Sequence, residues 1–175
     1  MYFNSPPLAI VDHPADAKHR TIGRAGQFPQ WIVIHHTGGD NSLNWLSTTS
    51  DPPVSCHRLI SKAGVNYKIV QDKDTAYCAG YAVVGPIPSK TGLNFNYYSL
   101  NIELENRGNG TDEYPFAQMQ MCANQVVEWW AAYGFLPVVG HGDVDSGKND
   151  PLGFDWSLLY RLIKDRLSAC LVLPA

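Results

Sequence analysis

WIVIHH, residues 31–36, is a short apolar run that ends in two adjacent histidines. Continuous runs of branched apolar residues are typical of a strand that is covered on both faces, so we expect an interior strand here. The turn TGGD follows directly. A histidine pair at the end of a buried strand is compatible with a metal site, a catalytic base or a structural strand end. The other segments of the chain have to decide among these.

Several further segments carry strand or helix patterns. Apolar runs and alternation predict four more strands, at residues 57–61, 66–71, 98–106 and 137–140. Two segments repeat apolar residues at the spacing of an amphipathic helix, 116–133 and WSLLYRLIKDRLSAC. Gly64 lies in the short loop between the first two of these strands, and Gly134 ends the first helix. This mixture predicts an α/β domain, with a mixed central β-sheet flanked by helices.

The length of the chain, 175 residues, is enough for one domain and short for two. Residues 1–29 hold several prolines among polar residues and predict an irregular N-terminal arm. Residues 30–175 are then the single domain. Residues 81–96 are rich in glycine, proline and asparagine, which predicts a long loop, and long loops in compact domains are often functional.

Composition excludes several classes of partner. A net charge of −3 and a pI near 6.0 leave no broad basic surface for nucleic acid. No apolar run approaches the ~20 residues of a membrane-spanning helix, and the first residues lack the basic region of a secretory signal. We therefore expect a monomer that is synthesised in the cytoplasm and binds neither nucleic acid nor a membrane.

A second predicted strand also leads to a histidine, because PVVG at 137–140 is followed by His141. The loop after it, HGDVDSGKND, ends at Asp150. Strand ends in α/β sheets gather functional residues, and two imidazoles with one carboxylate form the open ligand set of a catalytic zinc. No HExxH helix is present, and single histidines and loop carboxylates are commonly structural. The spacing alone therefore leaves both interpretations open.

Five sequence blocks between residues 30 and 165 resemble the zinc-dependent N-acetylmuramoyl-L-alanine amidases, namely IVIHHTGG, VSCHRLISKAGVNYKIVQD, AYCAGYA, NYYSLNIELEN and VVGHGDVDSGKNDPLGFDW. That superfamily includes amidase-type phage lysozymes, muropeptide-recycling amidases and peptidoglycan recognition proteins. The resemblance implies one Zn²⁺ per chain, in a groove on one face of the sheet, held by His35, His141 and Asp150. Because successive side chains on a strand face opposite ways, we expect His36 to point away from the metal and to be structural.

The same resemblance implies roles for further residues. Glu103, the first glutamate of NIELEN, takes the position of the general base, and Lys148 takes that of the lysine that stabilises the developing oxyanion. Asn96 and His57 take positions that imply contacts with the substrate. Glu105 lies on the same face of its strand as Glu103, and we expect it to be solvated or structural.

Two positions depart from the family pattern. Cys56 stands where phage-type members carry a tyrosine before the histidine of the second block, which places more weight on Glu103. In the third block, Cys78 replaces the histidine of the common WHAG. Neither cysteine falls at the third-ligand position of the family, so we expect both to be small buried residues and not ligands.

The resemblance implies hydrolysis of the amide bond between the lactyl group of N-acetylmuramic acid and the L-alanine of the stem peptide. Peptidoglycan or a muropeptide is then the partner. Two alternatives stay open: a recognition module that binds peptidoglycan without cleaving it, and a zinc peptidase that cuts within the stem peptide. The complete ligand set favours an enzyme. Its setting is either a bacteriolytic phage endolysin acting on the cell wall or a cytoplasmic recycling enzyme.

Overall fold

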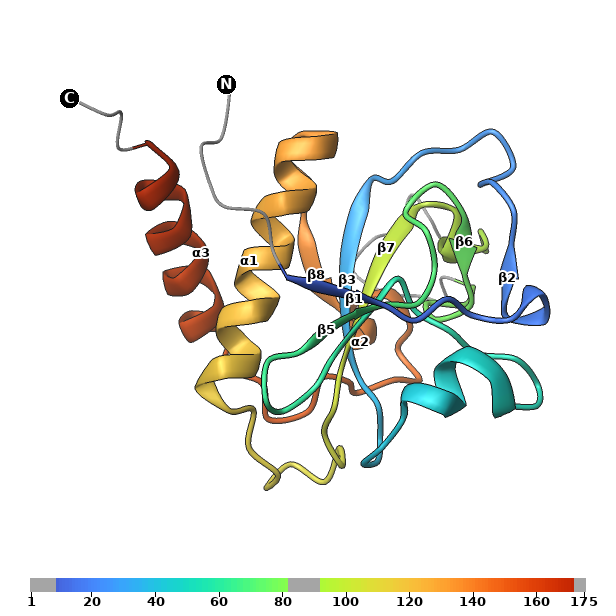
Figure 1. Cartoon of the computed structure of the whole chain (residues 1–175), viewed down its shortest axis with the longest axis horizontal. Helices are drawn as coiled ribbons and strands as arrows, with labels where there is room; N and C mark the ends of the chain where they lie inside the picture. The colour runs from blue at the N-terminus through green and yellow to red at the C-terminus, as the bar shows by residue number, and fades with distance from the viewer. Residues whose placement is uncertain (1–8, 82–91, 172–175) are drawn as a thin grey trace.

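The computed structural model describes residues 9–81 and 92–171, which form a layered α/β fold around a six-stranded sheet (Figure 1). In the order β1-β5-β4-β7-β3-β8, the strands are Ile10–Asp12, Asn66–Lys68, Arg58–Ile60, Ser99–Leu104, Trp31–His36 and Val138–Gly140. The β4–β5 pair is antiparallel and the other neighbours are parallel. The predicted mixed sheet is therefore confirmed.

Helices α1 (Phe116–Tyr133) and α3 (Trp156–Leu171) lie side by side against one face of this sheet (Figure 1). The main core fills the space between these helices and the sheet. The sheet contributes the buried side chains Ile32, Ile34, Leu100, Ile102 and Leu104 to this core. These residues alternate along β3 and β7, so burial of one face against the helices determines which residues face the other way.

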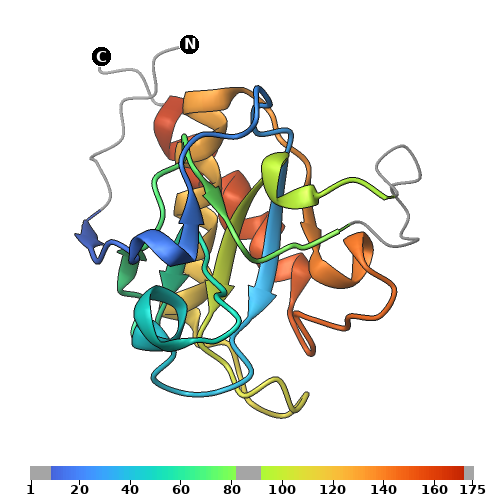
Figure 2. The same ribbon diagram turned by 90° about the vertical axis from the view of Figure 1, so that its right-hand side faces the viewer.

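The opposite face of the sheet, toward the viewer in Figure 2, is surrounded by short elements. These are the 3-10 helices η1 (Ala17–His19) and η4 (Phe95–Tyr97), the π-helix η2 (Trp45–Thr49), and the single helical turn α2 (His141–Val144). A two-stranded sheet of β2 (Arg20–Thr21) and β6 (Thr75–Ala76) adds to this layer. No described helix has both the length and the apolar composition needed to cross a bilayer.

Strands β3 and β7 are the part of the sheet that positions polar groups. They run parallel, with Val33 opposite Asn101 and His35 opposite Glu103. All four side chains belong to the face turned away from α1 and α3, because their neighbours along the chain point into the main core. The register therefore places an imidazole and a carboxylate next to each other at the ends of two adjacent strands.

The N-terminal segment is more ordered than the sequence analysis expected. Residues 10–12 form β1, which pairs in parallel with β5 at the edge of the main sheet. Arg24 is buried, and its guanidinium donates hydrogen bonds to the backbone carbonyls of Asp72 and Ser99 (2.9 and 3.0 Å). Proline content alone did not reveal these contacts. Most of the predicted 81–96 loop, residues 82–91, lies outside the described part of the chain.

Helix α1 has the predicted bounds, and Gly134 follows it with a φ of +80°. In its last turns Trp129 is 2% exposed, whereas Tyr133 is 41% exposed. The indole of Trp129 donates to Asp72 Oδ2 at 3.0 Å and lies under the guanidinium of Arg58, 5.3 Å from the ring centre. Trp129 thus meets the sheet beside the main apolar stripe, where polar partners satisfy its ring N–H.

The β4–β5 hairpin provides a test of the packing between sheet and helix. Gly64 has a φ of +79°, and a Cβ there would lie 2.8 Å from the carbonyl oxygen of Ala117 in α1. Gly23 has a similar φ of +74° but open space around it. Alanine at either position pays about 1–2 kcal/mol for the left-handed backbone, and Gly64→Ala adds about 1–3 kcal/mol for the clash. Urea denaturation of both variants measures the difference, and equal losses would contradict the close approach.

Candidate active site

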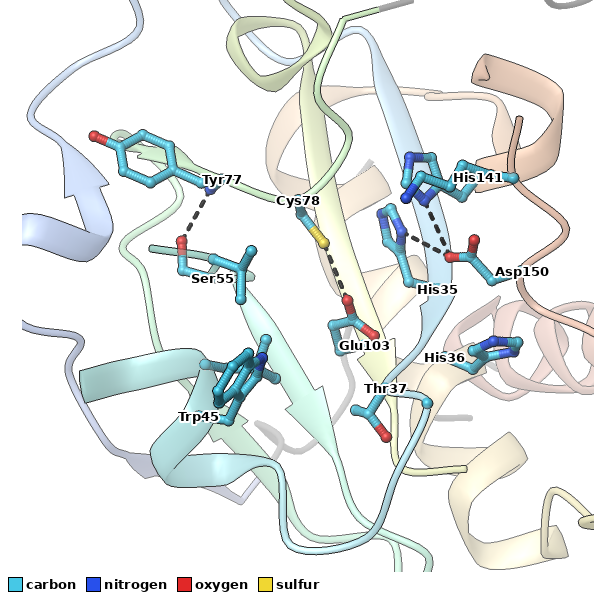
Figure 3. Close-up of a pocket in the computed structure, with 14 residues that line it drawn as sticks. His35, His36, Thr37, Trp45, Ser55, Tyr77, Cys78, Glu103, His141 and Asp150 are labelled. Carbon is cyan, nitrogen blue, oxygen red and sulfur yellow. Dashed lines mark hydrogen bonds and ion pairs between the residues drawn. The ribbon is translucent and has the colours of Figure 1, made fainter. Parts of the chain in front are cut away.

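Three potential metal ligands from separate parts of the chain meet at one edge of the sheet (Figure 3). His35 is on β3, His141 begins α2 directly after β8, and Asp150 lies in the loop that follows. Because β3 and β8 are parallel neighbours, their carboxyl ends bring the two imidazoles together. The Nδ1 atoms of both rings lie 3.1 Å from the same oxygen, Oδ2 of Asp150.

The hydrogen bonds of His35 show that this group fits a cation. Its Nε2 faces Asn101 Oδ1 at 3.1 Å and its Nδ1 faces Asp150, so both ring nitrogens point at acceptors. Burial lowers the pKa of His35, which favours a neutral ring with one proton for two acceptors. If the proton stays on Nε2, Nδ1 has only a lone pair to face the Asp150 carboxylate. A cation between these two atoms then compensates the negative charge of Asp150. Asn101 then holds the ring in place, as outer partners of metal-binding histidines commonly do.

The geometry of the three donors is also suitable for a tetrahedral ion. Nitrogen and oxygen ligands of one zinc ion lie about 3.4 Å apart when Zn–N and Zn–O are near 2.1 Å. Asp150 Oδ2 lies 3.1 Å from the Nδ1 atom of each imidazole, and the ligand atoms lie within 4.8 Å of one another. Burial opposes ionisation of Asp150, but the hydrogen bonds from His141 and His35 outweigh it and hold its pKa well below the usual range.

Glu103 faces the same pocket from β7. Its Oε1 accepts a hydrogen bond from the thiol of Cys78 at 3.3 Å, while Oε2 is buried and has no hydrogen-bond partner. Burial, reinforced by the negative charge of Asp150, raises the pKa of Glu103 to about 8. A carboxylate with such a pKa accepts and returns protons near neutral pH, which is what a general acid–base catalyst requires.

These residues line a pocket of ≈ 280 Å³. Lys148 contributes to its wall from the exposed loop before Asp150, and its positive charge slightly opposes the rise in the pKa of Glu103. Trp45 and Tyr77 line the side away from the histidines (Figure 3). Trp45 is 51% exposed, so its indole presents an apolar surface at the entrance. Neither aromatic residue belongs to a sequence pattern that marks it as a site residue.

The two residues expected to contact the substrate lie behind the pocket wall, among other segments of the chain. His57 is fully buried, and its Nδ1 accepts a hydrogen bond from the backbone N–H of Asn101 at 3.0 Å. The Oδ1 of Asn96 accepts from the backbone amides of three consecutive residues, at 3.0, 2.8 and 3.1 Å. Neither side chain lines the pocket. Both side chains therefore stabilise the backbone around the site: His57 accepts a hydrogen bond from β7, and Asn96 from the turn that carries Cys78.

His36 and Glu105 have structural contacts, in agreement with expectation. The ring of His36 points away from the His35–Asp150 pair (Figure 3), and its Nδ1 accepts from the backbone N–H of Leu152 at 3.1 Å. The carboxylate of Glu105 accepts from the backbone amides of Asn41 and Lys62, at 2.8 and 3.3 Å. The three cysteines whose side chains are described, Cys56, Cys78 and Cys122, are free thiols.

Comparisons with known proteins identify the family and the fold of this chain. The sequence model of a family described as N-acetylmuramoyl-L-alanine amidase matches residues 25–153. A search of curated proteins found no match. Among solved structures, AmpD superposes with a TM-score of 0.75 at 24% identity, covering 93% of this chain and 99% of AmpD. The catalytic domain of PlyG gives 0.68 at 19% identity, covering 96% of this chain and 100% of that domain.

A third structure shows a related enzyme with a ligand. AmiD from E. coli, in complex with anhydro-N-acetylmuramic acid-L-Ala-D-γ-Glu-L-Lys, has a TM-score of 0.63 and 28% identity over 78% of this chain and 59% of AmiD. The structural likenesses establish the fold, and the family match covers most of the chain. The protein therefore belongs to the N-acetylmuramoyl-L-alanine amidase family, and it is an enzyme that hydrolyses the bond between N-acetylmuramic acid and L-alanine in peptidoglycan.

Proposed function

We propose that this hydrolysis takes place in the pocket between β3, β7 and the 141–150 loop, with one Zn²⁺ per chain held by His35, His141 and Asp150. The observation that carries the proposal is the convergence of two Nδ1 atoms on one carboxylate oxygen, 3.1 Å from each. When bound, zinc polarises a carbonyl and lowers the pKa of water to about 7, which is the chemistry that cleavage of an unactivated amide requires.

Glu103 moves the proton in this scheme. Its partner-free Oε2 takes a proton from the water that attacks the lactyl carbonyl, as a new C–O bond forms. The same oxygen then gives the proton to the amine of L-alanine as the C–N bond breaks. The raised pKa of Glu103 suits both halves of the cycle, because a carboxylate of ordinary pKa would be a weaker base toward the attacking water.

Lys148 provides positive charge where negative charge develops. Its loop lies at the pocket wall, and its backbone N–H donates to the carbonyl of Asp145 at 3.0 Å, which orders the turn. An ammonium group at this wall stabilises the oxygen of the tetrahedral intermediate more than the neutral carbonyl of the substrate. Trp45 and Tyr77, on the other wall, offer apolar surface to the sugar or the stem peptide of a muropeptide.

Product analysis tests the function directly. The zinc-loaded protein is incubated with purified crosslinked peptidoglycan and, separately, with a soluble anhydro-muropeptide. We expect new amino termini that begin with L-alanine, detected by mass spectrometry of the released peptides. Binding without release would support a recognition module, and products that leave alanine on the sugar would support a peptidase. Faster cleavage of the crosslinked peptidoglycan would indicate a wall-lytic role, and faster cleavage of the soluble anhydro-muropeptide would indicate a recycling role.

Substitutions separate the proposed ligand from the proposed base. Asp150→Ala should lower zinc affinity, whereas Glu103→Gln should keep stoichiometric zinc and lower kcat by about 10²–10⁴-fold, since a base contributes that much. Glu105→Gln is the matched control, because this carboxylate lies directly after the same strand and accepts hydrogen bonds from the backbone amides of Asn41 and Lys62. Elemental analysis and initial rates measure both effects. Full activity in Glu103→Gln at equal zinc content would place the base elsewhere.

Activity should fall on the acid side of neutrality. Glu103 must be ionised to accept a proton, and its raised pKa means that it becomes protonated at a higher pH than an ordinary glutamate. Protons also compete with the metal for the imidazoles, so we expect kcat/KM to decline as the pH falls below about 8. Zinc content is measured at each pH to separate the two causes. A rate that stays flat down to about pH 4 would contradict this assignment.

A further inference from the structure

A second group of potential ligands overlaps the first. His35, Cys78 and Glu103 each offer a ligand atom, and these atoms all lie within 4.8 Å of one another. All three side chains line the same pocket, and Figure 3 shows the thiol facing the carboxylate. Cys78 comes from the segment between β6 and η4, so this group joins three separate parts of the fold.

The Glu103 carboxylate points to a ligand independently of the thiol. Glu103 is only 8% exposed, and its Oε2 is buried with no hydrogen-bond partner. A buried carboxylate oxygen without a donor is costly unless a cation or a proton satisfies it. The Sγ of Cys78 lies 3.3 Å from the other oxygen of this carboxylate, Oε1. Sulfur and oxygen ligands of one tetrahedral ion lie about 3.6 Å apart, given M–S near 2.3 Å and M–O near 2.1 Å.

The two ligand groups share one residue, His35. Its Nε2 lies 3.1 Å from the amide oxygen of Asn101, and a ring that donates this hydrogen bond binds a metal through Nδ1. That Nδ1 also lies 3.1 Å from Asp150 Oδ2 in the first group. In this tautomer one nitrogen serves both groups, so one ion occupies one group or the other. The first offers two nitrogens and an oxygen, whereas the second offers nitrogen, sulfur and oxygen, and soft cations prefer thiolate.

We propose that His35, Cys78 and Glu103 form an alternative binding position for a soft divalent cation of the cadmium class. On binding, the thiol proton of Cys78 leaves to solvent and a metal–sulfur bond takes its place. A cation here removes His35 from the first group and uses Glu103 as a ligand. The consequence for catalysis rests on the proposed function of Glu103, because a carboxylate bound to a metal is not available as a base. The binding position itself does not depend on that role.

The test uses the metal-free full chain and Cd²⁺ as the probe. One equivalent of CdCl₂ should produce the ultraviolet charge-transfer absorption of a cadmium–thiolate bond in the wild type. Cys78→Ala should abolish this absorption yet still bind one Cd²⁺ in equilibrium dialysis, through His35, His141 and Asp150. Asp150→Ala should keep the absorption, since it removes only the first group. Cys122→Ala is the matched control, because this thiol belongs to α1 and is buried in the main core.

Two results would overturn the proposal: Cd²⁺ bound to the wild type without thiolate absorption, or absorption that persists in Cys78→Ala. Cys78→Ser provides a second variant if the alanine variant does not fold, since its hydroxyl still donates to Glu103, and it too should lose the absorption. The zinc-loaded wild type is assayed in parallel for release of L-alanine termini. Release without a cadmium–thiolate signal would remove the alternative position and leave the amidase function standing.

Discussion

The parallel, in-register pairing of β3 with β7 is the constraint on which the rest of the site depends. It places His35 opposite Glu103 and Val33 opposite Asn101 on one face of the sheet. The other face is buried against α1 and α3, so a slip of β3 by one residue would turn His35 toward the apolar core and away from Glu103. Burial of the main core therefore also sets the spacing between the proposed ligand and the proposed base.

Burial then gives the polar face its chemistry. A neutral His35 with acceptors on both ring nitrogens, an ionised Asp150 and a Glu103 with one partner-free oxygen are each unfavourable alone. Together they form a pocket that favours a divalent cation and a transferable proton. The same closeness brings Cys78 within reach of Glu103, so a site suited to zinc also contains a softer set of ligands.

Much of this arrangement was predictable where one local pattern decides the outcome. The 3.6-residue spacing identified α1 with its bounds, and the alternation in 98–106 placed Glu103 and Asn101 on the face opposite Leu100 and Ile102. The sequence pattern did not indicate contacts between distant segments. Asn96 and His57 are the clearest case, since each accepts hydrogen bonds from backbone groups of another segment.

The sequence by itself determined the α/β class, the strand ends that carry His35 and His141, and the family likeness of the blocks around them. These follow from local periodicity and from residue types at fixed separations along the chain. Only the tertiary structure decided that the two imidazoles share one oxygen of Asp150, that Asn101 holds His35, and that Cys78 meets Glu103. Distances between side chains from separate strands and loops depend on strand order and packing, which no single segment encodes.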